Sequence, residues 1–183
     1  MTVAAVVLAA GGGTRFIADH HKLLADLRGR PVVAWALEHA REAGLDETVV
    51  VTGAVQVPAE PGVTMLHNPD WQQGQATSLQ VALRHADAQG HDAIVVGMGD
   101  QPGVPPDTWR AVASVVAPIV VPTYDGQRGS PVRLARSIWP LLPREGDEGA
   151  RVLMRSQPDL VTEVACSGDP ADIDTVEDLK RWS

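Results

Sequence analysis

The sequence predicts an α/β protein with an open, mostly parallel sheet and helices on both of its faces. Short apolar runs typical of buried strands alternate with amphipathic stretches typical of helices, which is the pattern of a parallel sheet. The chain has 183 residues, of which 44% are hydrophobic and 21% charged. This composition is that of a globular protein, and the length allows one independent core. We therefore expect a single domain over residues 1–183.

The first apolar run, residues 3–10, predicts a buried strand that leads into three consecutive glycines at positions 11–13. Glycines leave backbone N–H groups free to point inward and let the chain approach a ligand closely. Two cations, Arg15 and Lys22, follow the glycines, and this combination suits phosphate. The loop matches neither a dinucleotide-binding fingerprint nor a Walker A loop. A tight turn at the end of a strand is the alternative.

The first expected helix begins at Pro31 and stops at Gly44. Proline is favoured as the first helical residue because no N–H donor is needed there, and glycine is favoured just past the end. The apolar runs 48–52 and 63–67 predict the next two strands. A polar loop over residues 68–74 follows them.

Thr77 or Ser78 could cap the second expected helix, which Gly90 ends. The run 93–98 is the clearest central strand, because it is continuously apolar and is followed by a polar turn at residues 99–102.

A capped helix over residues 107–116, a strand over 119–121 and a turn at 125–126 are expected next. The final third of the chain has a less regular pattern. Near its end, Thr175 and Asp178 have the spacing of a capping box, which predicts the start of a last helix.

Three polar segments follow predicted strands: the glycine loop, residues 68–78 and Asp100. In open α/β sheets, ligands bind beyond the carboxyl ends of the strands, where the strand order reverses. We therefore expect the three segments to converge on one edge of the sheet.

Asp100 directly follows the central strand, where a carboxylate could hold a divalent metal in a phosphate pocket. A turn aspartate that caps the following segment is the alternative. Two more carboxylates, Asp172 and Asp174, directly precede the last helix and could complete the same metal site. Asp174 is favoured over Asp172 because its neighbour caps the helix and fixes its direction.

These motifs resemble those of the MobA-like nucleotidyltransferases. The first motif is Leu8-Ala9-Ala10-Gly11 with Arg15 and Lys22-Leu23-Leu24, and the others are Asp100-Gln101-Pro102 and the segment 172–179. Residues 68–78 resemble the family's nucleobase loop, and residues 126–131 and 146–151 resemble its acceptor region. Ile17 stands where the family usually has glycine, and the spacer before Lys22 is long.

The resemblance implies a Rossmann-like fold of the nucleotide-diphospho-sugar transferase type. It implies transfer of a nucleoside monophosphate from an NTP to a phosphorylated acceptor, with release of pyrophosphate. Lys22, Arg15 and Asp100 are the implied catalytic residues, and Asp100 and Asp174 are the implied Mg²⁺ ligands, with Asp172 the less favoured one. The implied nucleotide-binding residues are Leu8, Ala9, Ala10, Gly11, Gly12, Gly13, Thr14, Arg15, Lys22, Asn68, Gly74 and Ser78.

Ala10 makes the first motif similar to that of the molybdopterin cytidylyltransferases rather than the guanylyltransferases. This similarity implies CTP as donor and molybdopterin as acceptor, with a molybdoenzyme as a candidate partner. The alternatives are guanylyl transfer to molybdopterin, phospholactate or phosphoenolpyruvate, nucleotidyl transfer to sugar phosphates, and a non-catalytic nucleotide-binding module.

Other functions fit the sequence less well. A net charge of −8 argues against nucleic-acid binding, which needs a basic face. The longest apolar run, residues 111–122, is shorter than the roughly 20 residues of a membrane span. The one cysteine, Cys166, excludes an intrachain disulfide and fits a reducing cytoplasm. His20 and His21 are expected in a mobile, solvated loop, and Trp71 could touch a ligand.

Overall fold

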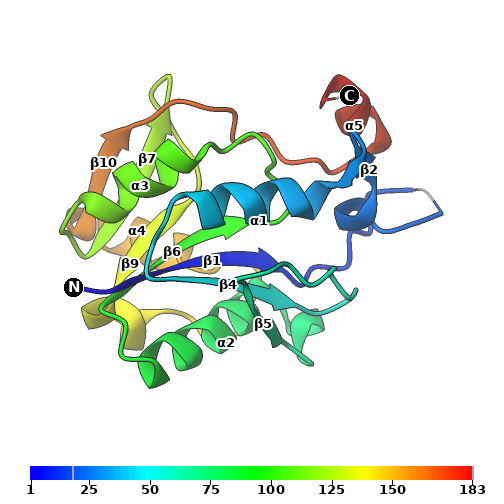
Figure 1. Cartoon of the computed structure of the whole chain (residues 1–183). Coiled ribbons are helices and arrows are strands. Elements are labelled where there is room, and N and C mark those ends of the chain that lie inside the picture. The colour runs from blue at the N-terminus through cyan, green and yellow to red at the C-terminus, as the bar shows by residue number, and fades with distance from the viewer. Residues whose placement is uncertain (18, 183) are drawn as a thin grey trace.

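A central sheet runs through the molecule, with helices on both sides (Figure 1). The computed structural model describes residues 1–17 and 19–182, and in this part of the chain the main sheet has eight strands. In spatial order these are β10 (Val161–Ala165), β7 (Ile119–Tyr124), β9 (Val132–Ala135), β6 (Ala93–Met98), β1 (Val3–Ala9), β4 (Glu47–Thr52) and β5 (Thr64–His67), and β8 (Gln127–Arg128) pairs with β7.

The predicted open, mostly parallel sheet is confirmed. β1 is parallel to both of its neighbours, β4 and β6, and the outer pairs β4–β5 and β10–β7 are also parallel. Only β8 and β9, among the described strands of this sheet, run antiparallel to their partners. The predicted turn at Asp125 and Gly126, whose φ angles are 48° and 80°, reverses the chain between β7 and β8.

Helices cover both faces of the sheet (Figure 1). α1 (Val32–Glu42) and α3 (Pro106–Ser114) lie on one face and α2 (Gln75–Ala88) on the other. Alternate residues of β1 serve the two cores: Val7 packs on the α1 side and Val6 on the α2 side. Because both faces of β1 are covered, its sequence is continuously apolar.

The remaining elements are short. They are the 3₁₀ turns η1 (Lys22–Leu24), η2 (Trp71–Gln73), η3 (Arg136–Leu141) and η4 (Pro158–Leu160), the hairpin of β2 (Asp26–Leu27) and β3 (Arg30–Pro31), and the helices α4 (Arg151–Ser156) and α5 (Val176–Trp182). Among the described residues, the helices are all too short or too polar to cross a membrane.

A third, smaller core joins the two ends of the chain. Phe16, directly after the glycine loop, packs in it with Ile173, which precedes α5 and is fully buried. Figure 1 shows α5 beside β2, on the same side of the molecule as the end of β1. This core fastens the C-terminal carboxylates to the glycine loop.

Three predicted helix starts were wrong. Pro31 precedes α1 instead of opening it. α2 begins at Gln75 without a side-chain cap, because Gly74 adopts a φ of 108° that turns the chain into the helix directly. Thr77 and Ser78 lie inside its first turns. α3 begins at Pro106, so Asp107 lies in the first turn instead of capping it.

Candidate active site

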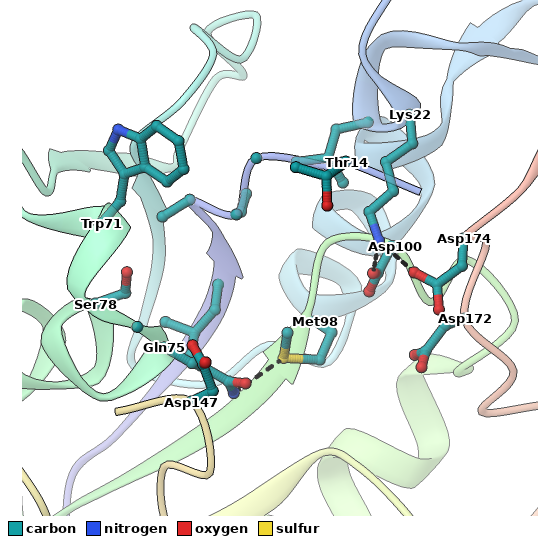
Figure 2. A pocket seen from close by; sticks show the side chains of 18 of the residues that line it. Thr14, Lys22, Trp71, Gln75, Ser78, Met98, Asp100, Asp147, Asp172 and Asp174 are labelled. Carbon is teal, nitrogen blue, oxygen red and sulfur yellow. Dashed lines mark hydrogen bonds and ion pairs between the residues drawn. The ribbon is translucent and has the colours of Figure 1, made fainter. Parts of the chain in front are cut away.

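A cavity of about 620 Å³ opens beyond the carboxyl ends of β1 and β6. The glycine loop, the start of α2, Asp100 and the segment before α5 all line it. Figure 2 shows Trp71 on one side and the cluster of Lys22, Asp100 and Asp174 on the other. The predicted convergence of polar segments at this edge is therefore present.

The cavity brings together every predicted nucleotide-binding and metal-binding residue except Asn68. Sequence reasoning missed Gln75 and Met98, whose side chains lie in contact in the cavity, with 3.5 Å between Gln75 Nε2 and Met98 Sδ. Gln75 is the first residue of α2 and Met98 the last residue of β6. These positions at the ends of a helix and a strand were the only features of the sequence that could have indicated a place in the cavity. Trp71, Gln72, Gln101, Asp147 and Arg151 complete the polar and aromatic lining.

Asn68 is buried, with 1% of its surface exposed, and does not line this cavity. Its Nδ2 donates hydrogen bonds to Thr77 Oγ1 at 2.8 Å and to Ser78 Oγ at 2.9 Å. Its Oδ1 accepts a hydrogen bond from the N–H group of Asp70. The amide of Asn68 is thus used inside the protein, where it ties the loop before η2 to the start of α2. Asn68 is thus the one expected nucleotide-binding residue that does not line this cavity, and its contact with the nucleotide stays a prediction.

Lys22 bridges two of the predicted site carboxylates. Its Nζ lies 2.6 Å from Asp100 Oδ2 and 2.7 Å from Asp174 Oδ1. Burial disfavours the charge of Lys22, but the charges and hydrogen bonds of the two carboxylates outweigh it and raise the pKa of the ammonium. Arg15 pairs with the other oxygen of Asp174 at 3.0 Å. Residues from three distant segments therefore form one charged cluster (Figure 2).

The direction of Asp174 comes from local structure. Thr175 Oγ1 accepts a hydrogen bond from the N–H of Asp178, and Asp178 Oδ2 accepts one from the N–H of Thr175. This reciprocal pair is the predicted capping box at the start of α5. The N–H of Asp174 also donates to Asp178 Oδ2, so the cap fixes the backbone of Asp174 as well.

Asp172 is held differently. Gln101 Nε2 donates hydrogen bonds to Asp172 Oδ1 at 2.7 Å and to the carbonyl oxygen of Pro170 at 2.9 Å, while Gln101 Oε1 accepts one from the hydroxyl of Ser130. Asp172 is exposed at the surface, but partial loss of solvent around its carboxyl, together with the charge of Asp100, raises the pKa of that carboxyl. Gln101 thus holds Asp172 beside Asp100 and Asp174.

The cluster has the features of a cation site. Asp100 Oδ1 is buried and has no hydrogen-bond partner among the described residues, and an unpaired buried oxygen is where a cation would be stabilised. Among the described residues, no group of three or more metal-binding side chains is already arranged around a point. An ion held by Asp100 and Asp174 would take its other ligands from substrate phosphates and water, which is how Mg²⁺ is commonly bound.

Two side chains, those of Trp71 and His21, pack so closely against the glycine loop that they leave little room for a Cβ atom there. A Cβ atom on Gly12 would lie 3.0 Å from the ring of Trp71, and one on Gly13 would lie 2.8 Å from His21 Nε2. Gly13 also has a φ of 60°, which side chains rarely adopt. Ile17, in contrast, is 89% exposed and does not line the cavity. The side chain that replaces the family's usual glycine therefore takes no part in lining the cavity.

His21 was wrongly expected in a solvated loop. It is half-buried, its Nε2 lies 2.9 Å from the carbonyl oxygen of Gly11, and its Nδ1 accepts a hydrogen bond from the N–H of Leu23. Burial, with the neighbouring charge of Lys22, lowers the pKa of the imidazole, although the hydrogen bond to Gly11 acts in the opposite direction. His20, in contrast, is exposed.

A second cavity of about 900 Å³ adjoins the first, and six residues line both: Leu8, Gln75, Met98, Gln101, Arg151 and Asp172. Its floor is apolar and comes mainly from the sheet, while Arg128, Arg151 and Arg155 bring cations to its lining. These arginines come from the segments that resemble the family's acceptor region or lie next to them.

Comparisons with known proteins agree with this geometry. The chain is 32% identical to the nicotine blue oxidoreductase of Paenarthrobacter nicotinovorans, over 98% of this chain and 95% of that protein. The crystal structure of Rv0371c from Mycobacterium tuberculosis H37Rv matches with a TM-score of 0.83 and 31% identity, covering 99% of this chain and 97% of that one. A complex of Rv0371c with manganese matches with a TM-score of 0.76 and 30% identity, covering 100% and 98%.

The match to a family covers most of the chain. Residues 5–161 match the MobA-like NTP transferase domain, and this range includes the glycine loop, Lys22, Asp100 and most of both cavities' linings. The chain belongs to the MobA-like NTP transferase family, as its motifs predicted, and is a nucleotidyltransferase.

Proposed function

We propose that this nucleotidyltransferase moves CMP from CTP to a phosphorylated acceptor, with molybdopterin the favoured acceptor and pyrophosphate the second product. One observation carries the proposal: Lys22 and its two carboxylate partners stand beside the glycine loop, in a cavity that adjoins a second cavity with arginines. A donor triphosphate and an anionic acceptor could then occupy neighbouring sites.

The roles of the residues follow from their charges. The glycine loop offers backbone N–H groups to the β- and γ-phosphates, and Arg15, whose side chain is 75% exposed, can reach the same groups with its planar fork. Lys22 would neutralise charge that develops at the α-phosphate. A phosphate monoester is already anionic at neutral pH, so the acceptor oxygen needs no general base. The residues' main contribution is to position the reactants and stabilise charge.

Asp100 and Asp174 would hold the metal, for which Mg²⁺ is the first choice. When bound, the ion would neutralise charge on the phosphate oxygens of the reacting groups. The manganese complex of the Mycobacterium relative supports a divalent cation in such proteins. Lys22 holds Asp100 Oδ2 and Asp174 Oδ1 in this structure, so its charge and that of a bound cation would act on the same two carboxylates.

The second cavity supports an acceptor with an apolar body and an anionic end. Its apolar lining includes Leu79 from α2 and Val96 and Val121 from the sheet. Arg128 pairs with Glu163 and Arg155 with Glu148. The charges of these two arginines are thus partly neutralised by glutamates. Arg151 lines both cavities and so lies between the donor and the acceptor sites. We therefore assign Arg151 to the acceptor phosphate.

The choice of CTP rests on Ala10. Its methyl group and the Cβ of Trp71 both lie beside Gly53, and Ala10 and Trp71 both line the cavity. A larger residue than glycine at this position should leave less room for a purine. GTP-dependent transfer to molybdopterin, phospholactate or phosphoenolpyruvate is the alternative, and a non-catalytic nucleotide-binding module is the second.

The test is release of pyrophosphate from each NTP, with and without molybdopterin, phospholactate, phosphoenolpyruvate and sugar phosphates. We expect release that requires CTP, Mg²⁺ and molybdopterin together. Release with GTP alone among the nucleotides would favour the guanylyl alternative, and no release with any pair would favour the non-catalytic module. Pyrophosphate is also specific for nucleotidyl transfer, so the assay separates this function from the oxidoreductase activity in the Paenarthrobacter protein's name.

A further inference from the structure

We propose that His21 is a positioning residue that fastens the glycine loop to the turn carrying Lys22. The loop's N–H groups and the Lys22 ammonium would then form one preassembled phosphate-binding unit. The inference rests on the proposed function, because it assumes that this loop binds the phosphates of a nucleotide.

Two hydrogen bonds carry the proposal. On one side of the imidazole, Nε2 lies 2.9 Å from the carbonyl oxygen of Gly11. On the other side, Nδ1 accepts a hydrogen bond of 3.2 Å from the N–H of Leu23. With this bond, His21 caps the start of η1. Lys22 lies in η1. A single rigid ring therefore connects the loop to the backbone that places the ammonium.

The bond to Gly11 also orients a donor. In a trans peptide the C=O and N–H groups point in opposite directions. When His21 holds the carbonyl of Gly11, the N–H of Gly12 must point away from the ring. Both glycines line the nucleotide cavity, so the orientation of this peptide decides which donors a phosphate meets there.

The two hydrogen bonds of the His21 ring determine which of its nitrogens carries a proton. Nδ1 accepts the Leu23 N–H and so carries no proton, and Nε2 must carry the proton that it donates to Gly11. The ring is therefore neutral. The charged groups that act on it are Lys22, which opposes protonation, and Asp100, which favours it. The lowered pKa of His21 agrees with a neutral ring at physiological pH.

Packing supports the same role. The ring lies against Gly13, where a Cβ atom would come within 2.8 Å of Nε2. His21 belongs to the residues that lengthen the spacer before Lys22. The departure from the family's spacing thus supplies a side chain that folds back onto the loop.

Two substitutions separate the two hydrogen bonds. His21→Asn keeps an oxygen in place of Nδ1 and can still cap η1, but it is too short to reach Gly11. His21→Gln places an amide N–H group where Nε2 stands and can still bind the Gly11 carbonyl. His20→Ala, at the exposed neighbour, is the matched control.

Two measurements compare the variants. Isothermal titration calorimetry, in the presence of Mg²⁺, gives the affinity of each protein for inorganic tripolyphosphate and for CTP. Amide hydrogen exchange of residues 11–15 reports the order of the loop.

We expect His21→Asn to weaken binding of both probes about tenfold, the scale of one lost hydrogen bond, and to speed exchange in the loop. His21→Gln should restore most of both properties, and His20→Ala should change neither. Wild-type affinity and slow exchange in His21→Asn would overturn the role of His21, and so would failure of Gln to restore them. A wild-type protein that binds neither probe would instead overturn the proposed function, and the exchange measurement would still test the attachment of the loop.

Discussion

Lys22 and Asp100 form an ion pair in which the ammonium nitrogen lies 2.6 Å from Oδ2 and both side chains are only 12% exposed. The second oxygen of Asp100 is buried and has no hydrogen-bond partner in the part of the chain that the structure describes. The lysine thus neutralises carboxylates that, by our account, hold a metal during catalysis. Lysine and metal should therefore compete for the same site until a triphosphate arrives.

This competition predicts weak binding of Mn²⁺ in the absence of nucleotide. Lys22→Met keeps the length of the side chain and removes its charge, so it should raise the affinity for Mn²⁺ about tenfold or more, as expected for a unit charge a few ångströms away. The free Mn²⁺ signal in electron paramagnetic resonance measures this affinity. Lys180→Met, at an exposed position of α5, is the control. Equal affinities of wild type and Lys22→Met would contradict the competition.

Lys22 should also matter for the chemical step. Lys22→Ala should lower kcat by a factor on the order of 10²–10³, the usual scale for one preorganised electrostatic group. CTP binding should suffer less, because the loop and Arg15 still hold the phosphates. Steady-state kinetics and an equilibrium Kd together give this comparison. An effect confined to KM would make Lys22 a binding residue only.

Asp100→Asn should abolish turnover and leave the fold intact. The asparagine fills the same space but removes one charged oxygen ligand, which weakens Mg²⁺ binding. Asp107→Asn, at a carboxylate that is 81% exposed, should leave turnover unchanged. Turnover as a function of Mg²⁺ concentration, with circular dichroism of each variant, checks the prediction. Near-normal turnover at low Mg²⁺ would return Asp100 to a role in its turn.

Two isoleucines, one inside the small third core and one outside it, can be compared to test how much this core contributes to stability. Ile173 is fully buried between Asp172 and Asp174 in the chain, whereas Ile17 is 89% exposed. Ile173→Ala should lower the free energy of unfolding by about 2–5 kcal/mol, and Ile17→Ala should change it by less than about 0.5 kcal/mol. Urea denaturation followed by tryptophan fluorescence gives both values. Similar losses in the two variants would mean that the small core contributes little.

Much of the fold could be predicted because its signals are local. β1 is apolar along its whole length since both of its faces are covered, and the capping box of Thr175 and Asp178 needs only four residues. The antiparallel insertion of β9 between β6 and β7 had no such signal, because it depends on pairings between distant segments.

For the site, too, the features with a local sequence pattern could be predicted, and the contacts between distant side chains could not. Glycines before Arg15 and a carboxylate after a central strand are local patterns, and the cavity brings them together. The internal role of Asn68 and the attachment of His21 to Gly11 depend on where side chains meet after folding. Polarity alone suggested a ligand contact for the first and exposure to solvent for the second.

Base choice should depend on Ala10. Ala10→Gly removes a methyl group that lies beside Gly53 in the lining of the cavity and should relax the preference for CTP by admitting the larger guanine. A site built for one base leaves polar groups unpaired with the other, so the wild-type preference should be large. The ratio of kcat/KM for CTP and GTP, in wild type and variant, measures it. A clear GTP preference in the wild type would refute the cytidylyl assignment alone.

The central claim is that the α-phosphate of the donor moves to the acceptor, and the fate of labelled phosphates tests it most directly. CTP labelled at the α-phosphate or at the γ-phosphate is incubated with Mg²⁺ and molybdopterin, with Asp100→Asn as the inactive control. We expect the α-label to appear in the acceptor and the γ-label in pyrophosphate, in equal amounts, with the wild-type enzyme only. Failure to form labelled acceptor and labelled pyrophosphate with any nucleotide and acceptor tested would contradict nucleotidyl transfer by this site. Equal formation with Asp100→Asn would contradict it too.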